Sequence, residues 1–166
     1  IALVGPFQSG KTTLLESLLV RTGAISRQGA VRDGSSVGDS SAEARAHAMS
    51  VEANVATTEY LGDRYTFIDC PGSIEFSNEM RDVLPLCDAA VVVCEADPRK
   101  IPALQLILRE LEELGVPRLL FLNKIDIATQ RVHETLGVLQ PASRTPLLLR
   151  QIPIWQNGIA TGFIDL

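Results

Sequence analysis

The segment Gly5-Pro-Phe-Gln-Ser-Gly-Lys-Thr12 fits the pattern G-x-x-x-x-G-K-[ST] and directly follows the apolar run Ile1–Val4. Glycines let a backbone wrap closely around a phosphate, and successive N–H groups at the start of a helix stabilise its negative charge. Lys11 can reach a β- or γ-phosphate, and the Thr12 hydroxyl can be a ligand of Mg²⁺. A chance match to this pattern becomes rare between a predicted strand and a predicted helix. The residues therefore predict a phosphate-binding loop.

A second motif, Asp69-Cys-Pro-Gly72, also follows a predicted strand. An aspartate at that place can hold Mg²⁺ through water, and the Gly72 N–H can sense a γ-phosphate. Taken alone, the pattern D-x-x-G carries little weight, because aspartate and glycine are favoured in ordinary turns.

The third motif, Asn123-Lys-Ile-Asp126, follows the last predicted strand of the series. Asp126 can accept hydrogen bonds from the N1 and N2 groups of guanine, a pattern that adenine does not offer. Asn123 can bond the base, and Lys124 can pack along it. A polar turn that caps the next helix is the alternative for this tetrapeptide alone. The three motifs occur in order at the carboxyl ends of strands, where open α/β sheets bind ligands, and together they predict a guanine-nucleotide site.

Apolar spacing and turn residues predict the elements that position these motifs. A long polar loop is expected over 23–50, and Gly62-Asp63 is the expected turn of a hairpin. Strands separated by helices of this length predict an α/β fold with a mostly parallel sheet and helices on both faces. The expected strands are 1–4, 51–60, 64–68, 89–94 and 117–122, and the expected helices are 12–23, 76–84, 100–114 and 129–139.

The last part of the chain has a different pattern. Leu147–Ile154 and Ile159–Leu166 are predicted strands, and Asn157-Gly158 between them is a strong hairpin signal. We therefore expect a division into residues 1–140, an α/β unit, and residues 141–166, the first hairpin of a separate subdomain.

Composition narrows the class of protein. The 166 residues are 46% hydrophobic and 21% charged, with a net charge of −5, which excludes a disordered chain. No apolar run approaches the roughly 18–20 residues of a membrane span. We therefore expect no membrane partner. Three cysteines, Cys70, Cys87 and Cys94, form no C-x-x-C pair, which favours a reduced, cytoplasmic protein. Because the net charge is negative, we expect no direct binding of nucleic acid by this piece.

Over its whole length, the sequence resembles the G domain of elongation factor G and its relatives, a class of GTP-binding translation factors. The resemblance rests on the Gly-Lys-Thr-Thr13 run, DCPGSIEF (69–76), NKID and the QIPI…GFIDL pattern (151–166). It implies a three-layer P-loop NTPase fold, with 1–140 as a G domain that lacks its last strand, last helix and final guanine motif. We expect weakened nucleotide affinity for this piece by itself.

The resemblance also implies GTP/GDP and Mg²⁺ as ligands, with the loop 23–50 and the stretch 70–81 as switches. The implied catalytic residues are Lys11, Gly72 and Ser73, and the implied metal ligands are Thr12, Ser50 and Asp69. The implied nucleotide-binding residues are Gly5, Pro6, Phe7, Gln8, Ser9, Gly10, Lys11, Thr12, Thr13, Asp69, Gly72, Asn123, Lys124 and Asp126.

The sequence differs from the family pattern at several positions that the resemblance associates with GTP hydrolysis. Ser73 stands where these factors carry the histidine that places the attacking water, His47-Ala48 stands for Arg-Gly, and Gln8 stands where many have Asp. His47 is either a substitute for that histidine or a solvated loop residue. One hypothesis is a GTPase that is slow or stimulated by a ribosomal partner of the full-length protein. The alternative is a GTP-responsive regulatory switch with little hydrolysis. A third, an ATP-using P-loop protein, conflicts with Asp126.

Overall fold

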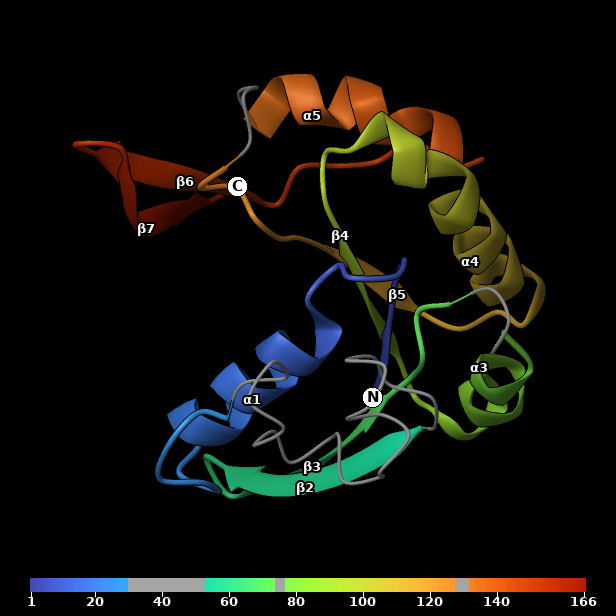
Figure 1. The fold of residues 1–166 in the computed structure, drawn as a ribbon, viewed down its shortest axis with the longest axis vertical. Coiled ribbons are helices and arrows are strands. Elements are labelled where there is room, and N and C mark those ends of the chain that lie inside the picture. The colour runs from blue at the N-terminus through green and yellow to red at the C-terminus, as the bar shows by residue number, and fades with distance from the viewer. Residues whose placement is uncertain (30–52, 74–76, 128–131) are drawn as a thin grey trace.

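The computed structural model of the chain describes residues 1–29, 53–73, 77–127 and 132–166 (Figure 1). Its described strands form a five-stranded sheet in the order β2-β3-β1-β4-β5 and a separate two-stranded sheet, β6-β7. The strands are β1 (Ala2–Val4), β2 (Asn54–Tyr60), β3 (Asp63–Asp69), β4 (Ala90–Cys94), β5 (Arg118–Leu122), β6 (Gln151–Gln156) and β7 (Ile159–Asp165). The helices are α1 (Lys11–Arg21), α3 (Ser77–Val83), α4 (Ile101–Glu113) and α5 (Val132–Leu139), with short 3₁₀ turns at Leu84–Leu86, Pro98–Lys100 and Gln140–Ala142.

The larger sheet is mostly parallel, as the alternation of strands and helices predicts. β1 pairs in parallel with β3 and β4, and β5 pairs in parallel with β4, whereas β2 runs antiparallel to β3. Leu3 of β1 lies opposite both Asp69 of β3 and Val91 of β4. The carboxyl ends of four strands consequently meet at one edge of the sheet, where the three sequence motifs begin.

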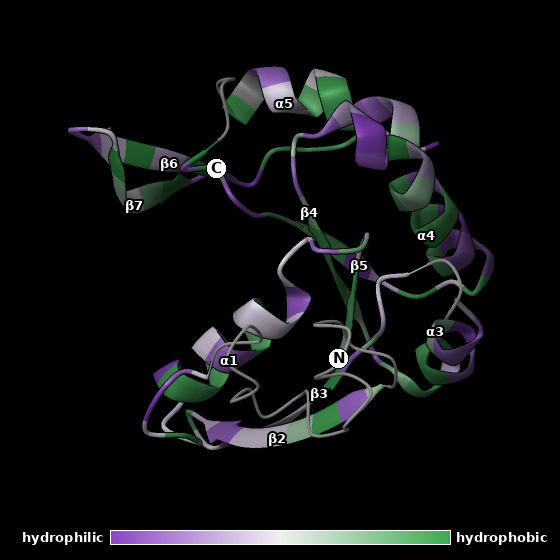
Figure 2. Ribbon diagram, viewed as in Figure 1, coloured by the Kyte–Doolittle hydropathy of each residue, from purple (hydrophilic) through white to green (hydrophobic). Residues whose placement is uncertain are grey.

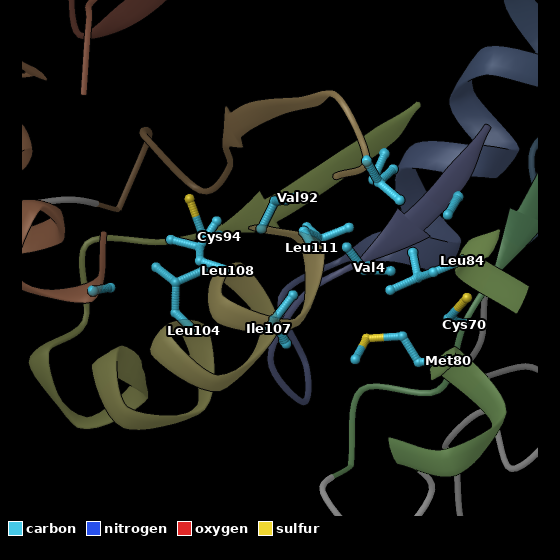
Figure 3. Close-up of a cluster of buried hydrophobic side chains, with 14 of the residues drawn as sticks. Val4, Cys70, Met80, Leu84, Val92, Cys94, Leu104, Ile107, Leu108 and Leu111 are labelled. Atoms are coloured by element: carbon cyan, nitrogen blue, oxygen red, sulfur yellow. The ribbon is translucent and has the colours of Figure 1, made fainter. Parts of the chain in front are cut away.

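Helices cover both faces of this sheet, and each face has its own hydrophobic core (Figure 1). Successive side chains of a strand point to opposite faces, so β1 contributes to both cores. Ala2 and Val4 pack in the larger core with α3 and α4 (Figure 3), while Leu3 packs with Leu15 and Leu19 of α1. The fold is therefore the three-layer α/β architecture expected from the sequence.

The helix α4 shows how local spacing produces this packing. Leu104, Leu108 and Leu111 recur at helical intervals and are buried against β1 and β4. On the same helix, Glu110 accepts two hydrogen bonds from the Arg81 guanidinium of α3, at 2.9 and 2.8 Å. This bidentate pair ties α3 to α4. No helix within the described ranges is long and apolar enough to cross a membrane.

The two hairpins differ from expectation at their boundaries. The first turn is centred on Leu61-Gly62 rather than Gly62-Asp63, with φ of 53° and 91° at these two residues. Both values are positive, as a two-residue type I′ turn requires, and this turn matches the twist of the flanking strands. In the second hairpin, the stretch 147–150 is not part of β6, which begins at Gln151.

The β6-β7 hairpin forms a sheet of its own. Its turn is Asn157-Gly158, as predicted, with φ of 51° and 78°. Apolar and polar residues are mixed along it (Figure 2), and Ile159 and Phe163 are 68% and 61% exposed. All residues of β7 are exposed, so the hairpin has little core of its own. A two-stranded hairpin of this kind is only marginally stable by itself. The division into residues 1–140 and 141–166 stays a prediction.

Candidate functional site

The segment between β1 and α1 is a tight loop that contains several residues with positive φ. Gly5 and Gly10 have φ of 151° and 95°, and Gln8 is also left-handed at 56°. A Cβ at Gly5 would lie 2.1 Å from the Val93 carbonyl oxygen, and one at Gly10 would lie 2.3 Å from Nδ2 of Asn123. Gly5 is therefore required by a backbone contact in addition to its φ, whereas a side chain at Gly10 would be strained by its φ and would displace the Asn123 amide.

Lys11 folds back over the beginning of this loop. Its Nζ donates hydrogen bonds to the carbonyl oxygens of Gly5 and Pro6, at 3.1 and 3.4 Å. The side chain is buried, and this burial lowers the pKa of the Lys11 ammonium, an effect that the nearby Asp69 carboxylate opposes. Lys11 is thus held at the loop by neutral carbonyl groups, which are weaker partners than a phosphate would be.

The Asn123-Lys124 segment holds the next part of the loop. Asn123 Nδ2 donates to the Ser9 carbonyl oxygen at 2.9 Å, and Lys124 Nζ donates to that of Gln8 at 2.7 Å. The Asn123 side chain also accepts from the Lys124 backbone N–H at 2.9 Å. Two sequence motifs more than 110 positions apart are therefore in direct contact.

The remaining carbonyl group, that of Phe7, accepts a hydrogen bond from Lys100 Nζ at 2.9 Å. Lys100 is also paired with Glu95, and Oε1 of Glu95 lies 3.3 Å from Lys124 Nζ. All five consecutive carbonyl groups of residues 5–9 thus accept hydrogen bonds from side chains. The carbonyl groups of the loop are thereby engaged by the chain itself, and within the loop the Ser9 N–H also donates to the Pro6 carbonyl oxygen, at 3.2 Å.

Thr12 and Asp69 meet beneath the loop. Thr12 Oγ1 donates to Asp69 Oδ2 at 2.6 Å, and both residues are buried. Their contact follows from the sheet, because Asp69 ends β3 beside β1 while Thr12 begins α1 after β1. The first and second motifs therefore supply one pair of oxygen atoms at the carboxyl edge of the sheet.

Gly72 lies directly against the loop. A Cβ at this residue would be 2.3 Å from Lys11 Nζ and 3.0 Å from the carbonyl oxygens of Gly5 and Pro6. Ser73 is partly exposed and lines a cavity of about 120 Å³ between the 71–73 segment, α3 and α4. The conformation of this segment is thereby coupled to the position of Lys11.

Cys70, between Asp69 and Gly72, has a packing role. It is fully buried in the larger core (Figure 3), and burial raises the pKa of its thiol to about 12. A thiol with this pKa is protonated near neutral pH and is a poor nucleophile.

Some predicted site residues have exposed side chains, and others lie outside the described residues. Asp126 is exposed in the turn that follows Lys124, which itself has a φ of 56°. Thr13 is exposed on α1, whereas Phe7 is 42% exposed on the loop. Ser50 and His47, the predicted metal ligand and the alternative water-positioning residue, both lie outside the described residues.

Sequence reasoning missed Glu95 and Lys100. Glu95 immediately follows β4 and thus lies at the same carboxyl edge as Asp69 and Asn123. The argument that selected those two residues, a polar side chain directly after a buried strand, applies equally to Glu95. No comparable signal marks Lys100, whose contact with Phe7 spans 93 positions.

The three-layer fold and the glycine-lined loop with its buried lysine define a P-loop nucleotide-binding domain. Residues 1–145 match the family model described as "Elongation factor Tu GTP binding domain". The chain therefore belongs to this family of GTP-binding domains.

Curated relatives agree with this assignment. The chain is 46% identical over 166 residues to "Elongation factor G-like protein" of Synechocystis sp., covering 100% of this chain and 25% of the relative. It is 30% identical over its whole length to "Elongation factor G 2" of Streptomyces coelicolor, covering 24% of that protein. A crystal structure of a Thermus thermophilus protein superimposes with a TM-score of 0.87 at 34% identity, covering 99% of this chain and 24% of the other. The chain spans about a quarter of the length of these relatives.

Proposed function

We propose that this chain binds GTP and GDP, with the phosphates at the loop of residues 5–12 and the guanine beside the Asn123–Asp126 segment. The observation that carries the proposal is the set of five consecutive loop carbonyl groups held by side chains. These hydrogen bonds hold the loop backbone in one conformation before an anion arrives, which lowers the entropic cost of binding. The start of α1, where Gly10 is the N-cap without a side-chain capping bond, adds a favourable dipole.

Guanine recognition is assigned to Asp126, with Asn123 and Lys124 beside the base. The exposed position of the Asp126 carboxylate next to the loop-bound Lys124 supports this role. Competition between GDP and ADP for full-length protein, measured by fluorescence of a labelled GDP, tests it. We expect a strong preference for GDP that Asp126→Ala removes. Equal displacement by ADP from the unmodified protein would instead support the ATP-using alternative.

Mg²⁺ fits the oxygen donors that the fold brings together. The Thr12 hydroxyl and the Asp69 carboxylate are hard oxygen ligands, 2.6 Å apart and buried beside the loop. We propose that these two residues, with Ser50 as the third protein contact, hold the ion together with phosphate oxygens. Bound there, the ion would neutralise phosphate charge. The chain's own contribution is to orient Thr12 and Asp69 through their hydrogen bond.

We propose further that the full-length protein is a cytoplasmic translation factor that hydrolyses GTP, slowly or when a ribosomal partner stimulates it. Support comes from the family and from the relatives named elongation factor G, of which this chain matches about a quarter. Lys11 and Gly72, in contact with the loop, would stabilise and sense the γ-phosphate. Phosphate release by full-length protein should rise on addition of ribosomes. Absence of any stimulation would contradict a ribosomal role.

Ser73 supports an alternative, a GTP-responsive switch with little hydrolysis. A serine hydroxyl is shorter than an imidazole and lacks its basic nitrogen, so it is a poor substitute for positioning an attacking water. Ser73 is partly exposed next to Gly72, where a larger side chain has room in the adjoining cavity. If Ser73 limits turnover, Ser73→His should raise the rate of GTP hydrolysis without changing GDP affinity. An unchanged rate would remove this explanation.

A further inference from the structure

Glu95 and Lys100 form an ion cluster with Lys124 at the edge of the phosphate loop. Lys100 pairs with Glu95, and the same oxygen, Oε1 of Glu95, lies 3.3 Å from Lys124 Nζ. The Lys100, Glu95 and Lys124 side chains are only 25%, 14% and 34% exposed. Their mutual attraction is therefore screened by solvent less than that of a pair on the open surface.

Each lysine of the cluster also holds the loop. Lys100 Nζ donates to the Phe7 carbonyl at 2.9 Å, and Lys124 Nζ donates to the Gln8 carbonyl at 2.7 Å. Gln8 has a φ of 56°, a conformation that a residue with a side chain adopts only when its surroundings hold it there. Two successive carbonyl groups next to this strained point are thus engaged by cations that share one carboxylate.

The backbone explains why the cluster lies there. Glu95 is the first residue after β4, at the carboxyl edge of the sheet. The short turn Pro98–Lys100 follows, capped by Asp97, whose carboxylate accepts from the Arg99 N–H at 3.0 Å. This turn brings Lys100 back over the loop immediately before α4 begins. The turn and the strand end place Lys100 and Glu95 beside Phe7 independently of the three sequence motifs.

We propose that Lys100 and Glu95 are positioning residues of the phosphate loop, which they hold in its binding conformation through the carbonyl groups of Phe7 and Gln8. This inference rests on the proposed nucleotide site, and it adds two residues outside the three motifs to that site. One carboxylate between two ammonium groups leaves a single positive charge at the loop edge, which also favours an anionic ligand.

The test compares Lys100→Met with Arg99→Met in the full-length protein, by titration with GDP. Arg99 is a matched control, because it is the neighbouring cation, its side chain is 89% exposed, and its described hydrogen bonds go to Asp97. We expect Lys100→Met to raise the Kd for GDP about tenfold, the effect of losing one hydrogen bond from a charged group. Arg99→Met should stay within about twofold of the unmodified protein.

Three further measurements separate positioning from general stabilisation. The preference for GDP over ADP should be unchanged in Lys100→Met, since the base contacts are retained. Lys100→Arg, which keeps a charged donor, should recover most of the affinity. Glu95→Gln should weaken GDP binding, and the Glu95→Gln/Lys100→Met double variant should lose less than the sum of the two single losses, because both act on the same carbonyl contact.

Failure of this inference differs from failure of the proposed function. If the unmodified protein does not bind GDP, the proposed function is wrong and the inference falls with it. If the unmodified protein binds GDP and Lys100→Met binds it equally well, only the inference is overturned. If Lys100→Met melts at a much lower temperature, Lys100→Arg decides: affinity near that of the unmodified protein supports the role, and a tenfold loss overturns it.

Discussion

Gly72→Ala tests whether the 70–73 segment and Lys11 share one fixed arrangement. The added Cβ would lie 2.3 Å from Lys11 Nζ, about 1 Å closer than the 3.4 Å at which ordinary contact begins. Lys11 cannot easily give way, because its Nζ is buried and bonded to the Gly5 and Pro6 carbonyl oxygens, which are themselves 3.0 Å from the new atom. Gly72 has no positive φ, so the effect is steric.

The magnitude follows from the two responses open to the protein. Either Gly72 moves away from the loop or Lys11 gives up a hydrogen bond. Overpacking of this kind costs about 1–3 kcal/mol, and a hydrogen bond from a charged group is worth about 1.5–3 kcal/mol. We therefore expect the free energy of unfolding to fall by about 1–3 kcal/mol and the Kd for GTP to rise at least about tenfold.

Urea unfolding and nucleotide titration of the full-length protein measure these two effects. Gly137→Ala in α5 is the matched control, because a Cβ there meets no atom within 4 Å and the residue is helical. That variant should be more stable, by about 0.5–1 kcal/mol, with unchanged GTP affinity. If Gly72→Ala behaves like Gly137→Ala in both assays, the contact between Gly72 and Lys11 does not constrain the site and the reasoning fails.

Three other predictions concern single side chains. Leu61 is 86% exposed at a φ of 53°, so Leu61→Asn should raise the free energy of unfolding by roughly 1 kcal/mol; a loss of stability on chemical denaturation would contradict the turn geometry. Thr12→Val removes the 2.6 Å hydrogen bond to buried Asp69 and should destabilise the fold by about 1–3 kcal/mol in the same assay. The Arg99 side-chain and backbone hydrogen bonds hold the pKa of the Asp97 carboxyl at about 2, below its ordinary value of 3.8. This carboxylate therefore stabilises the fold above about pH 4 and loses its effect as the pH falls through about 2; a carboxyl-carbon NMR titration with a midpoint near 3.8 would refute it.

The local pattern was enough to place the phosphate loop and the order of the elements. Gly5 and Gly10 bracket a segment between an apolar run and a helical repeat, and Asp69 and Asn123 each lie at the end of a buried strand. These are short-range signals, because strand, loop and helix are read from consecutive residues. Boundaries were less accurate: the first hairpin turn lies one residue earlier than predicted, because the register of the two strands pairs Tyr60 with Asp63 and leaves Leu61-Gly62 as the turn.

Contacts between distant segments were decided by the tertiary structure. Parallel pairing of β1 with β3 brings Asp69 to Thr12, and pairing of β4 with β5 brings Asn123 to the loop. Polar residues after strands could be selected from sequence, but their partners depend on strand order and register. Periodicity within one element contains no information about either quantity.

Lys100 shows this limit most clearly. The sequence Pro98-Arg99-Lys100 gives no reason to choose Lys100 rather than Arg99 as a contact of the loop. In the structure, the Arg99 side chain is 89% exposed. The course of the turn after β4 directs Lys100 to the Phe7 carbonyl and leaves Arg99 in solvent. Consecutive residues could therefore identify the kind of site, a loop for phosphate. Which side chains hold that loop in shape depends on how the sheet and its connections bring distant residues together.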